Sequence, residues 1–563
     1  MMEKGRVVFM KKRVYRGWFS LIALVLVLAG CSGGASPNDS GAEGGSASTG
    51  GETETVPISV FVNTDGNIDY KTNLFTKVLE KKANVKLQFT EVPYDGAAEK
   101  RQISLASGDY PDLYMLIPWV DKFSQSDLVK FGQQGVILPL NDLIDQYAPN
   151  IKKALDDHPD YKAMSIAPDG NIYGLTMLNE CFHCSYPNKM WVNTSWLKKL
   201  NLEVPKTTED FKKVLEAFKT KDPNGNGKAD EVPLSGSIEN FGVHILPFLM
   251  NGFIYDDDKY YLTVNGDKVD IAANKPEWKE GLAYARSLYA EGLIDPGAFT
   301  QNADAFKLIG NNTATELLGA GASMHPAIFT DTGEGNKYSS HYDAIPPLQG
   351  PHAAYATFNY PVDPGATFVL TNKASKEVQI AAIKMLDYIY TEEGQLLGNY
   401  GEEGKDWVKP KDGDVPLNEK AKPIFKTLEQ PAGSEPRNSA WGATAQYNHT
   451  REFRDGWIQE TDIYKNSGYE RRLQEATYLY ENKQPKEVYP NWSVWIDPAA
   501  ADEQSMLQQN IKDYVDQNAL QFVTGAKNLD KDWDAYVKGL DALNLKRYLE
   551  IMQQAYDTTK KAE

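Results

Sequence analysis

The sequence predicts an α/β protein built from two units, because short apolar segments alternate with amphipathic helical ones in two separate stretches of the chain. In the first stretch we expect strands at residues 58–62, 84–92 and 111–116. Helices are expected between them, over about 70–82 and up to residue 107. Strands that alternate with helices in this way favour a largely parallel sheet with right-handed crossovers.

The same alternation resumes after a pair of cysteines near residue 181. A strand is expected at 189–193, and Thr208 is expected to cap a helix that runs through Phe218. Later predicted elements are a helix at 278–290, a strand at 369–370, a helix at 376–390 and a helical tail over 502–557. With 563 residues, of which 41% are hydrophobic, the chain is long enough for two or more domains.

Residues 1–30 are predicted to be a lipoprotein signal peptide. Six basic side chains precede an apolar run, which ends in Leu28-Ala29-Gly30-Cys31. Small residues before Cys31 give a peptidase access to the bond, so we expect cleavage there and a lipid on Cys31. A retained transmembrane helix is the alternative, but the uncharged segment 17–30 is shorter than the ~20 residues that span a bilayer.

A flexible tether is expected over residues 31–56, where small and polar residues cannot bury enough apolar surface to fold. The whole chain has a formal net charge of −18. Removal of residues 1–30, which hold six Lys or Arg and one Glu, leaves 53 basic and 76 acidic residues, a net charge of −23. Such a charge repels nucleic acid and anionic lipid, which excludes a DNA-binding role.

The chain has three cysteines, so a lipid on Cys31 leaves one pair, Cys181 and Cys184. Outside the membrane this pair is expected to be a disulfide that braces a loop, or two unused thiols. His183 lies between the two cysteines, but no further Cys-x-x-Cys or His pair follows at the spacing of metal ligands. A zinc or redox role is therefore the less favoured interpretation.

Residues 222–231 have the pattern of a calcium-binding loop. Oxygen-bearing side chains stand at loop positions one, three, five and nine, Gly227 at six, and the Lys228 carbonyl at seven. A full EF-hand has Glu at position twelve, where this chain has Pro233, so its last carboxylate, Glu231, comes early. An Asx-rich turn that binds no ion is the alternative. An ion here would have a structural role, because every ligand helps to close the loop.

The common local signatures of catalysis are absent from the sequence, including Gly-x-Ser-x-Gly, His-Glu-x-x-His and the phosphate-binding loops. Paired glycosidase carboxylates have no fixed spacing, so a carbohydrate-active enzyme stays open. Aromatic side chains in predicted loops are candidates for stacking on a sugar, although each alone is better explained by packing. They are Trp119, Phe182, Tyr186, Tyr360, Trp441 and Trp492.

Several short motifs together resemble the family 1 extracellular solute-binding proteins, the lipid-anchored receptors of ABC importers for oligosaccharides. The resemblance covers nearly the whole mature chain. The motifs are Leu105-Ala106-Ser107-Gly108-Asp109-Tyr110-Pro111-Asp112, Gly135 to Leu140, Asp169 to Leu175, Trp191-Val192-Asn193 with Trp196-Leu197, and Tyr400-Gly401-Glu402-Glu403-Gly404.

This resemblance implies a two-lobed periplasmic-binding-protein fold of the class II type, in which hinge segments join two mostly parallel sheets flanked by helices. The N-terminal lobe would comprise residues 57–180 and about 367–430. The C-terminal lobe would comprise about 188–362 and 435–563, with the helical tail at its end. The chain would cross between lobes near 181–189, 360–366 and 431–441. The candidate ligand contacts in the cleft are then Trp119, Phe182, Tyr186, Tyr360, Glu403, Trp441 and Trp492.

The calcium-type loop is similar to that of the alginate-binding receptors in the same family. The resemblance implies that calcium is a structural cofactor. Its implied ligands are Asp222, Asn224, Asn226, Lys228, Asp230 and Glu231. Alginate is not expected as the ligand of this chain, because the acidic chain favours a neutral or weakly charged oligosaccharide.

The expected function is a non-catalytic receptor, monomeric and anchored by lipid to the outer face of a Gram-positive cell membrane. It would capture an oligosaccharide by closure of the cleft and deliver it to the permease subunits of an ABC transporter. Two alternatives stay open, namely a surface-attached glycosidase or lyase and a sugar sensor that feeds no importer.

Overall fold

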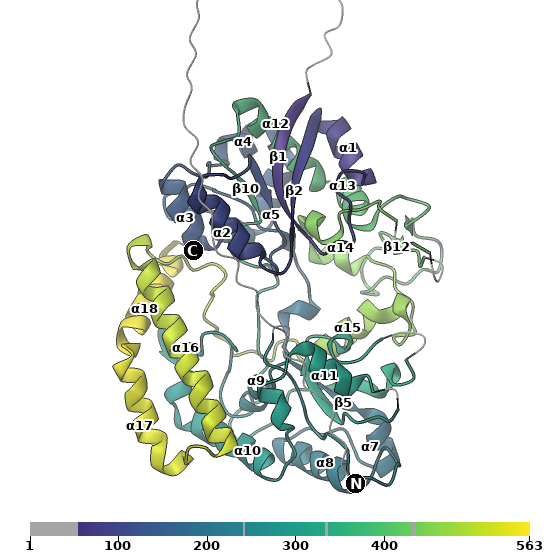
Figure 1. Ribbon diagram of the computed structural model, residues 1–563, viewed down its shortest axis with the longest axis vertical. Helices are drawn as coiled ribbons and strands as arrows, with labels where there is room; N and C mark the ends of the chain where they lie inside the picture. Colours follow the sequence, from purple (N-terminus) through teal and green to yellow (C-terminus); the bar gives the residue numbers. More distant parts are fainter. Residues whose placement is uncertain are drawn as a thin grey trace, which may run out of the picture. The chain divides into compact units, whose positions relative to one another are not determined.

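A computed structural model describes residues 55–562, apart from 240–241, 313, 333–335, 431–433 and 436 (Figure 1). The predicted signal peptide, Cys31 and most of the predicted tether lie outside the described residues. Within the described part of the chain, none of the helices combines the length and the apolar character that a membrane span requires.

The first lobe is built on a four-stranded sheet in the order β10-β3-β1-β2. Strands β1 (Val56–Thr64), β2 (Val85–Pro93) and β3 (Leu113–Met115) run parallel, and β10 (Phe368–Leu370) is antiparallel to β3. The helices α1 (Leu74–Ala83) and α2 (Ala97–Ser107) form the crossovers. The alternation of strands and helices therefore predicted this sheet correctly.

Further elements, some of which contribute residues to the lining of a cleft, belong to the first lobe. They are α3 (Gln125–Gln133), α4 (Asn141–Tyr147), α5 (Pro149–Asp157), α6 (Pro159–Ser165), β4 (Leu178–Asn179), α12 (Lys376–Ile389), α13 (Glu392–Gln395), η6 (Leu396–Tyr400), β11 (Trp407–Val408), β12 (Lys426–Thr427), η7 (Gly442–Ala445), β13 (Asn448–His449) and α14 (Arg451–Asp455).

The predicted return to the second lobe at about residue 435 is wrong. Trp441 and Tyr447 belong to the core of the first lobe, where the Trp441 ring lies 5.3 Å from that of Phe75. The Trp441 indole also donates a hydrogen bond to Thr76. Because these contacts bury the indole completely, the segment through β13 is bound to the first lobe.

The second lobe contains a three-stranded sheet in the order β8-β5-β9. Strand β5 (Lys189–Asn193) has the predicted bounds, but it is antiparallel to both β8 (Ala320–Ser323) and β9 (Tyr342–Ile345). The expectation of a mostly parallel sheet is therefore wrong for these strands. They are not joined by single crossover helices: several helices and the β6-β7 hairpin over residues 262–271 lie between β5 and β8, and short 3-10 turns lie between β8 and β9. Isolated parallel bridges, such as Ser235 to Gly321, extend the sheet.

The helix predicted to begin with a cap at Thr208 is α8 (Thr208–Thr220), whose cap is Thr207. The Thr207 hydroxyl accepts a hydrogen bond from the Asp210 amide, and the Asp210 carboxylate accepts one from the Thr207 amide. This reciprocal capping box moves the start of the helix by one residue.

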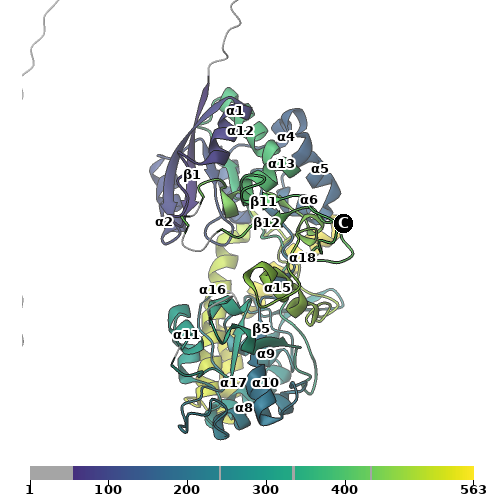
Figure 2. The ribbon, with the colours of Figure 1, turned by 90° about the vertical axis from the view of Figure 1, so that its right-hand side faces the viewer.

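Helices cover the second sheet, and the predicted helical tail is confirmed as three helices. Figure 2 shows α16 and α17 beside α10, with which both are in contact. The remaining elements are η1 (His183–Ser185), α7 (Thr194–Leu200), α9 (Ile245–Met250), β6 (Leu262–Asn265), β7 (Lys268–Ile271), η2 (Ala272–Asn274), α10 (Pro276–Ala290), η3 (Pro296–Phe299), α11 (Ala303–Gly310), η4 (Pro326–Ile328), η5 (Ser339–His341), η8 (Asn466–Gly468), α15 (Tyr469–Tyr478), η9 (Pro498–Ala500), α16 (Ala501–Thr524), α17 (Leu529–Ala542) and α18 (Leu545–Ala562).

Candidate functional site

A cleft of about 1410 Å³ is lined by residues of both lobes and of the segments that connect them. Its lining includes residues 359–364, which lead back to the first lobe, and six residues of the segment that leads from the first lobe to β5, namely Met177, Asn179, Cys181, His183, Cys184 and Pro187. This volume exceeds the ~300–1,000 Å³ of pockets for single drug-sized ligands. The cleft is therefore large enough for a ligand of several rings.

Two stacked rings form an aromatic platform in the cleft, which we define as Tyr360 and Trp492. Their centroids are 4.9 Å apart and their planes differ by 14°. The edge of Trp492 also contacts Phe358, at 6.1 Å between centroids, which fixes its orientation. Trp119 lines the same cleft and is 46% exposed. Flat rings of this kind present the faces on which the C–H side of a sugar can stack.

A second group of cleft residues forms a polar wall, which we define as Asn179, His183, Gln446, Arg454 and Glu470. Arg454 donates to the Asn179 side-chain oxygen at 3.1 Å and lies 3.7 Å from Glu470. The Asn179 amide donates to Gln446 at 2.8 Å. These mutual bonds hold donors and acceptors in fixed directions, an arrangement suited to binding hydroxyl groups.

Glu470 is the charged centre of the polar wall. Burial raises its pKa, but His183, 3.4 Å away, and then Arg454 outweigh that effect and hold the pKa at about 2. The carboxylate therefore stays ionised at neutral pH. A group in that state accepts hydrogen bonds but cannot act as a general acid.

The second lobe contributes an acidic side to the cleft, from the turn before β6 and from α16. Burial raises the pKa of Asp256 and of Asp258, while Lys512 acts in the opposite direction. Lys512 donates to Asp516 at 2.8 Å, and the Tyr261 hydroxyl also donates to Asp516. The cleft thus carries charges of both signs.

Three of the predicted ligand contacts, Trp119, Tyr360 and Trp492, lie together in the cleft, while three others do not contribute side chains to its lining. Trp441 is a core residue, 1% exposed. Tyr186 is 4% exposed, and its hydroxyl donates to Gln484. Phe182 is covered by the guanidinium of Arg451, 3.9 Å from the ring centroid. These rings pack against other side chains of the protein and do not line this cleft.

Glu403, the remaining predicted contact, also lies outside the cleft lining. Its half-exposed carboxylate pairs with Lys409 at 3.2 Å. The motif that contains Glu403 reaches the cleft instead through Tyr400, at the end of η6.

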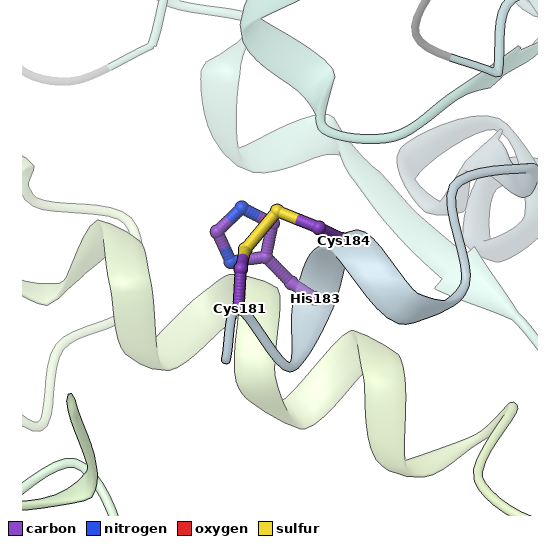
Figure 3. A group of neighbouring side chains, drawn as sticks. All are labelled: Cys181, His183 and Cys184. Atoms are coloured by element: carbon purple, nitrogen blue, oxygen red, sulfur yellow. A yellow bond between two sulfur atoms is a disulfide. The ribbon is translucent and has the colours of Figure 1, made fainter. Parts of the chain in front are cut away.

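The segment that first connects the lobes carries a disulfide between Cys181 and Cys184 (Figure 3). At the start of β5, the buried Lys189 ammonium donates to the carbonyl oxygens of His183 and Tyr186, at 2.8 and 2.5 Å. Burial lowers the pKa of Lys189 to about 7. The turn is therefore closed twice, by the disulfide and by a side chain of β5.

The calcium-type loop follows α8 and lies outside the cleft lining. The Asp222 carboxylate accepts hydrogen bonds from three backbone amides, those of Gly225, Asn226 and Gly227. Gly227 has φ +75°, which a side chain would disfavour. The side-chain amides of Asn224 and Asn226 donate to Asp230. The loop is thus closed by hydrogen bonds among the residues that are predicted as ligands.

Glu231 provides the clearest sign that the loop suits a cation. Its Oε1 atom is buried and has no hydrogen-bond partner among the described residues. Burial raises the pKa of Glu231, and the nearby Asp222 and Asp230 carboxylates add to that effect. A buried carboxylate oxygen that lacks a donor, beside other carboxylates, fits a hard cation as its missing partner.

Sequence reasoning missed the polar wall and the acidic side of the cleft. Asn179, Arg454 and Glu470 come from three separate elements, β4, α14 and α15, with no shared motif. The tail containing Lys512 was predicted only as packed helix. The single signal in the sequence was the crossing segment itself, which contains His183.

The chain matches the family model described as "Bacterial extracellular solute-binding protein" over residues 66–396. It is 32% identical over 509 residues, 87% of either chain, to the fructooligosaccharide ABC transporter substrate-binding protein FusA of Streptococcus pneumoniae. It is 27% identical to lipoprotein LipO of Bacillus subtilis over 433 residues, 75% of this chain and 77% of LipO.

Solved structures of S. pneumoniae FusA in complex with kestose, and of its EF-hand mutant in complex with fructo-nystose, superpose with a TM-score of 0.70 at 28% identity. Each comparison covers 90% of this chain and all of the FusA chain. This similarity confirms the predicted two-lobed α/β binding-protein fold. The family and these relatives are binding proteins rather than enzymes. The chain belongs to the family of bacterial extracellular solute-binding proteins.

Proposed function

We propose that this protein is the substrate-binding component of an ABC importer and that its ligand is an oligosaccharide. The observation that carries the proposal is the combination of an aromatic platform with a hydrogen-bonded polar wall in one large cleft. Rings bind the apolar faces of sugars, while amides and charged groups bind their hydroxyls. The printed function of FusA, a fructooligosaccharide transporter component, supports the same ligand class.

The ligand class is narrowed by charge. Seven Asp or Glu and four Lys or Arg line the cleft, and five carboxyl groups remain besides Asp256 and Asp258, whose pKa values burial raises. An excess of carboxylates raises the free energy of binding a polyanion, such as a polyuronate. We therefore infer a neutral oligosaccharide, large enough to contact the platform and the polar wall together.

Transport requires that ligand binding changes the protein surface that a permease contacts. Closure of the two lobes about the connecting segments would supply that change, since ligand contacts with both lobes stabilise the closed state. A lipid on Cys31 and the tether over 31–56 would keep the receptor on the outer face of the membrane. We expect it to act as a monomer, because each chain holds a complete cleft.

Calcium is proposed as a structural ion in the loop over 222–231. Its ligands would be the side chains of Asp222, Asn224, Asn226, Asp230 and Glu231 and the carbonyl of Lys228. The buried Oε1 atom of Glu231, which has no hydrogen-bond partner among the described residues, supports this assignment. The solved structure of a FusA EF-hand mutant also supports it, since such a loop is thereby named in FusA. The ion would hold the end of α8 to the segment that follows it, and would take no part in ligand contact.

Isothermal titration calorimetry tests the proposed function, with kestose-type fructooligosaccharides, other neutral oligosaccharides and polygalacturonate as the panel. We expect one neutral compound to bind at one site per chain and to remain intact after long incubation. Polygalacturonate should give no heat of binding. Products of cleavage, or binding of the polyuronate alone, would contradict the proposal.

A further inference from the structure

We propose that the Cys181-Phe182-His183-Cys184 turn is a second metal site, for a thiophilic divalent cation such as Zn²⁺, which forms when the disulfide is reduced. The ligands are the two cysteine sulfurs and one imidazole nitrogen of His183. This site differs from the calcium-type loop in every ligand, and its argument is independent of the proposed function.

The three ligand atoms are already close together. The two sulfurs and a ring nitrogen of His183 lie within 4.8 Å of one another, and Figure 3 shows the His183 ring beside the disulfide. Zn–S bonds of about 2.3 Å in a tetrahedral site place two sulfurs about 3.8 Å apart. The Cα atoms of Cys181 and Cys184 are 5.2 Å apart, so rotation of the side chains gives that separation without unfolding the turn.

The surroundings of His183 are those of a metal-bound histidine. Its Nδ1 atom lies 3.4 Å from the Glu470 carboxylate, which orients the ring and leaves Nε2 for the cation. Arg454, 3.7 Å from Glu470, fixes the carboxylate in turn. A carboxylate behind the distal nitrogen raises the basicity of a histidine ligand, and such partners are typical of zinc sites.

The turn has a second support that survives reduction. Lys189 donates to the carbonyl oxygens of His183 and Tyr186, and these bonds do not involve sulfur. All three ligand residues line the cleft, so a cation can reach them and a water molecule from the cleft can complete the coordination. Opening of the disulfide would therefore expose a formed site.

The redox step needs a dithiol as reductant. The dithiol transfers two electrons and two protons to the Cys181–Cys184 bond, which breaks to give two thiols, while the reductant closes its own disulfide. The cation then replaces the two thiol protons, which pass to solvent. Re-oxidation without metal restores the disulfide.

The test uses the full chain with Cys31→Ser, so that Cys181 and Cys184 are its only thiols. The chain is saturated with calcium, reduced with dithiothreitol, freed of reductant without oxygen, and titrated with Co²⁺. We expect one equivalent to give the near-ultraviolet absorption of a thiolate–Co²⁺ bond, and Zn²⁺ to displace it. The same chain in its oxidised form is the matched control and should show no such absorption.

Two variants distinguish a built site from two adjacent thiols. His183→Gln should weaken the Co²⁺ affinity of the reduced chain at least ~10-fold, and Glu470→Gln about 10-fold through the lost orientation of the ring. The proposal is overturned if reduction gives no thiolate absorption with Co²⁺, if His183→Gln leaves the affinity unchanged, or if reduction alone abolishes the far-ultraviolet circular dichroism of the fold.

Discussion

The aromatic platform and the polar wall line the same cleft but differ in how their side chains are held. Tyr360 and Trp492 are positioned mainly by ring stacking, at 4.9 Å, with one hydrogen bond from the Tyr360 hydroxyl to Asp160. Asn179, Arg454 and Glu470 are positioned by bonds to one another. Stacking tolerates many sugars, whereas a fixed set of donors and acceptors selects among them. We therefore expect the platform to determine affinity and the polar wall to determine specificity.

The largest expected effect is that of calcium removal on the stability of the fold. Because the calcium-type loop lies outside the cleft lining, this change should not alter the roles of the platform and the polar wall. Removal of calcium by a chelator should lower the free energy of unfolding by ~3 kcal/mol, the linkage value at 100 times the Kd. Asp222→Ala should lower the melting temperature of the calcium-loaded protein and abolish the effect of the chelator. Differential scanning calorimetry measures both. An unchanged melting curve after exhaustive chelation would show that calcium does not stabilise this fold.

Trp492→Ala should weaken oligosaccharide binding by ~2 kcal/mol, about thirtyfold, because it removes half of the platform. Trp533→Ala is the matched control, since this indole packs on Phe522 in the second lobe, outside the cleft lining. Calorimetric titration with the same ligand measures both variants. If the two lose equal affinity, the platform has no special role.

Protonation of His449, next to the cleft residue Tyr400, should make the folded state sensitive to acid. His449 is buried, its ring lies parallel to that of the cleft residue Tyr400, and burial and then Arg454 lower its pKa from 6.5 to about 3. Because the folded pKa lies below the unfolded one, His449 favours the folded state above pH 6.5, and this contribution declines as the pH falls towards 3. The limiting slope is ~1.4 kcal/mol per pH unit.

The difference between wild type and His449→Gln isolates this titration from those of the carboxylates. Urea unfolding at several values of pH between 7 and 4 is the measurement. The variant should be less acid-sensitive than wild type over that range. Parallel pH profiles would show that His449 does not titrate in the unfolding reaction.

Asn179→Ala should have the smallest effect on affinity and the clearest effect on selectivity. It removes one acceptor from Arg454 and one donor to Gln446, a change worth ~1 kcal/mol. Affinity for the best ligand should fall about fivefold, with little change for ligands that contact only the platform. Calorimetry across the oligosaccharide panel checks this. A uniform loss across all ligands would contradict the division of roles.

The sequence predicted best what is local. The strands and crossovers of the first lobe, β5 and the calcium-type loop each depend on consecutive residues with a recognisable period or spacing. Three aromatic residues of the cleft were also found, because they stand in predicted loops. Trp441 was wrongly predicted as a ligand contact on the same ground. Its position in a predicted loop does not reveal that its ring packs between Phe75 and Tyr70 in the core.

What the sequence could not predict depends on tertiary contacts. The antiparallel pairing of β5 depends on where strands over a hundred residues later return. The polar wall joins Asn179 to Arg454 and Glu470, which share no pattern before folding brings them together. The role of each of these residues depends on the side chains that it contacts. Contacts between residues far apart in the sequence produce no periodic pattern from which they could be predicted.

The central claim is that one neutral oligosaccharide contacts the platform and the polar wall at the same time. A crystal structure of the protein with the tightest ligand of the panel tests it most directly. We predict one sugar ring stacked on Tyr360 or Trp492 and hydroxyls of another ring bonded to Asn179, Arg454 or Glu470. A ligand bound outside this cleft, or one that contacts a single wall, would contradict the claim.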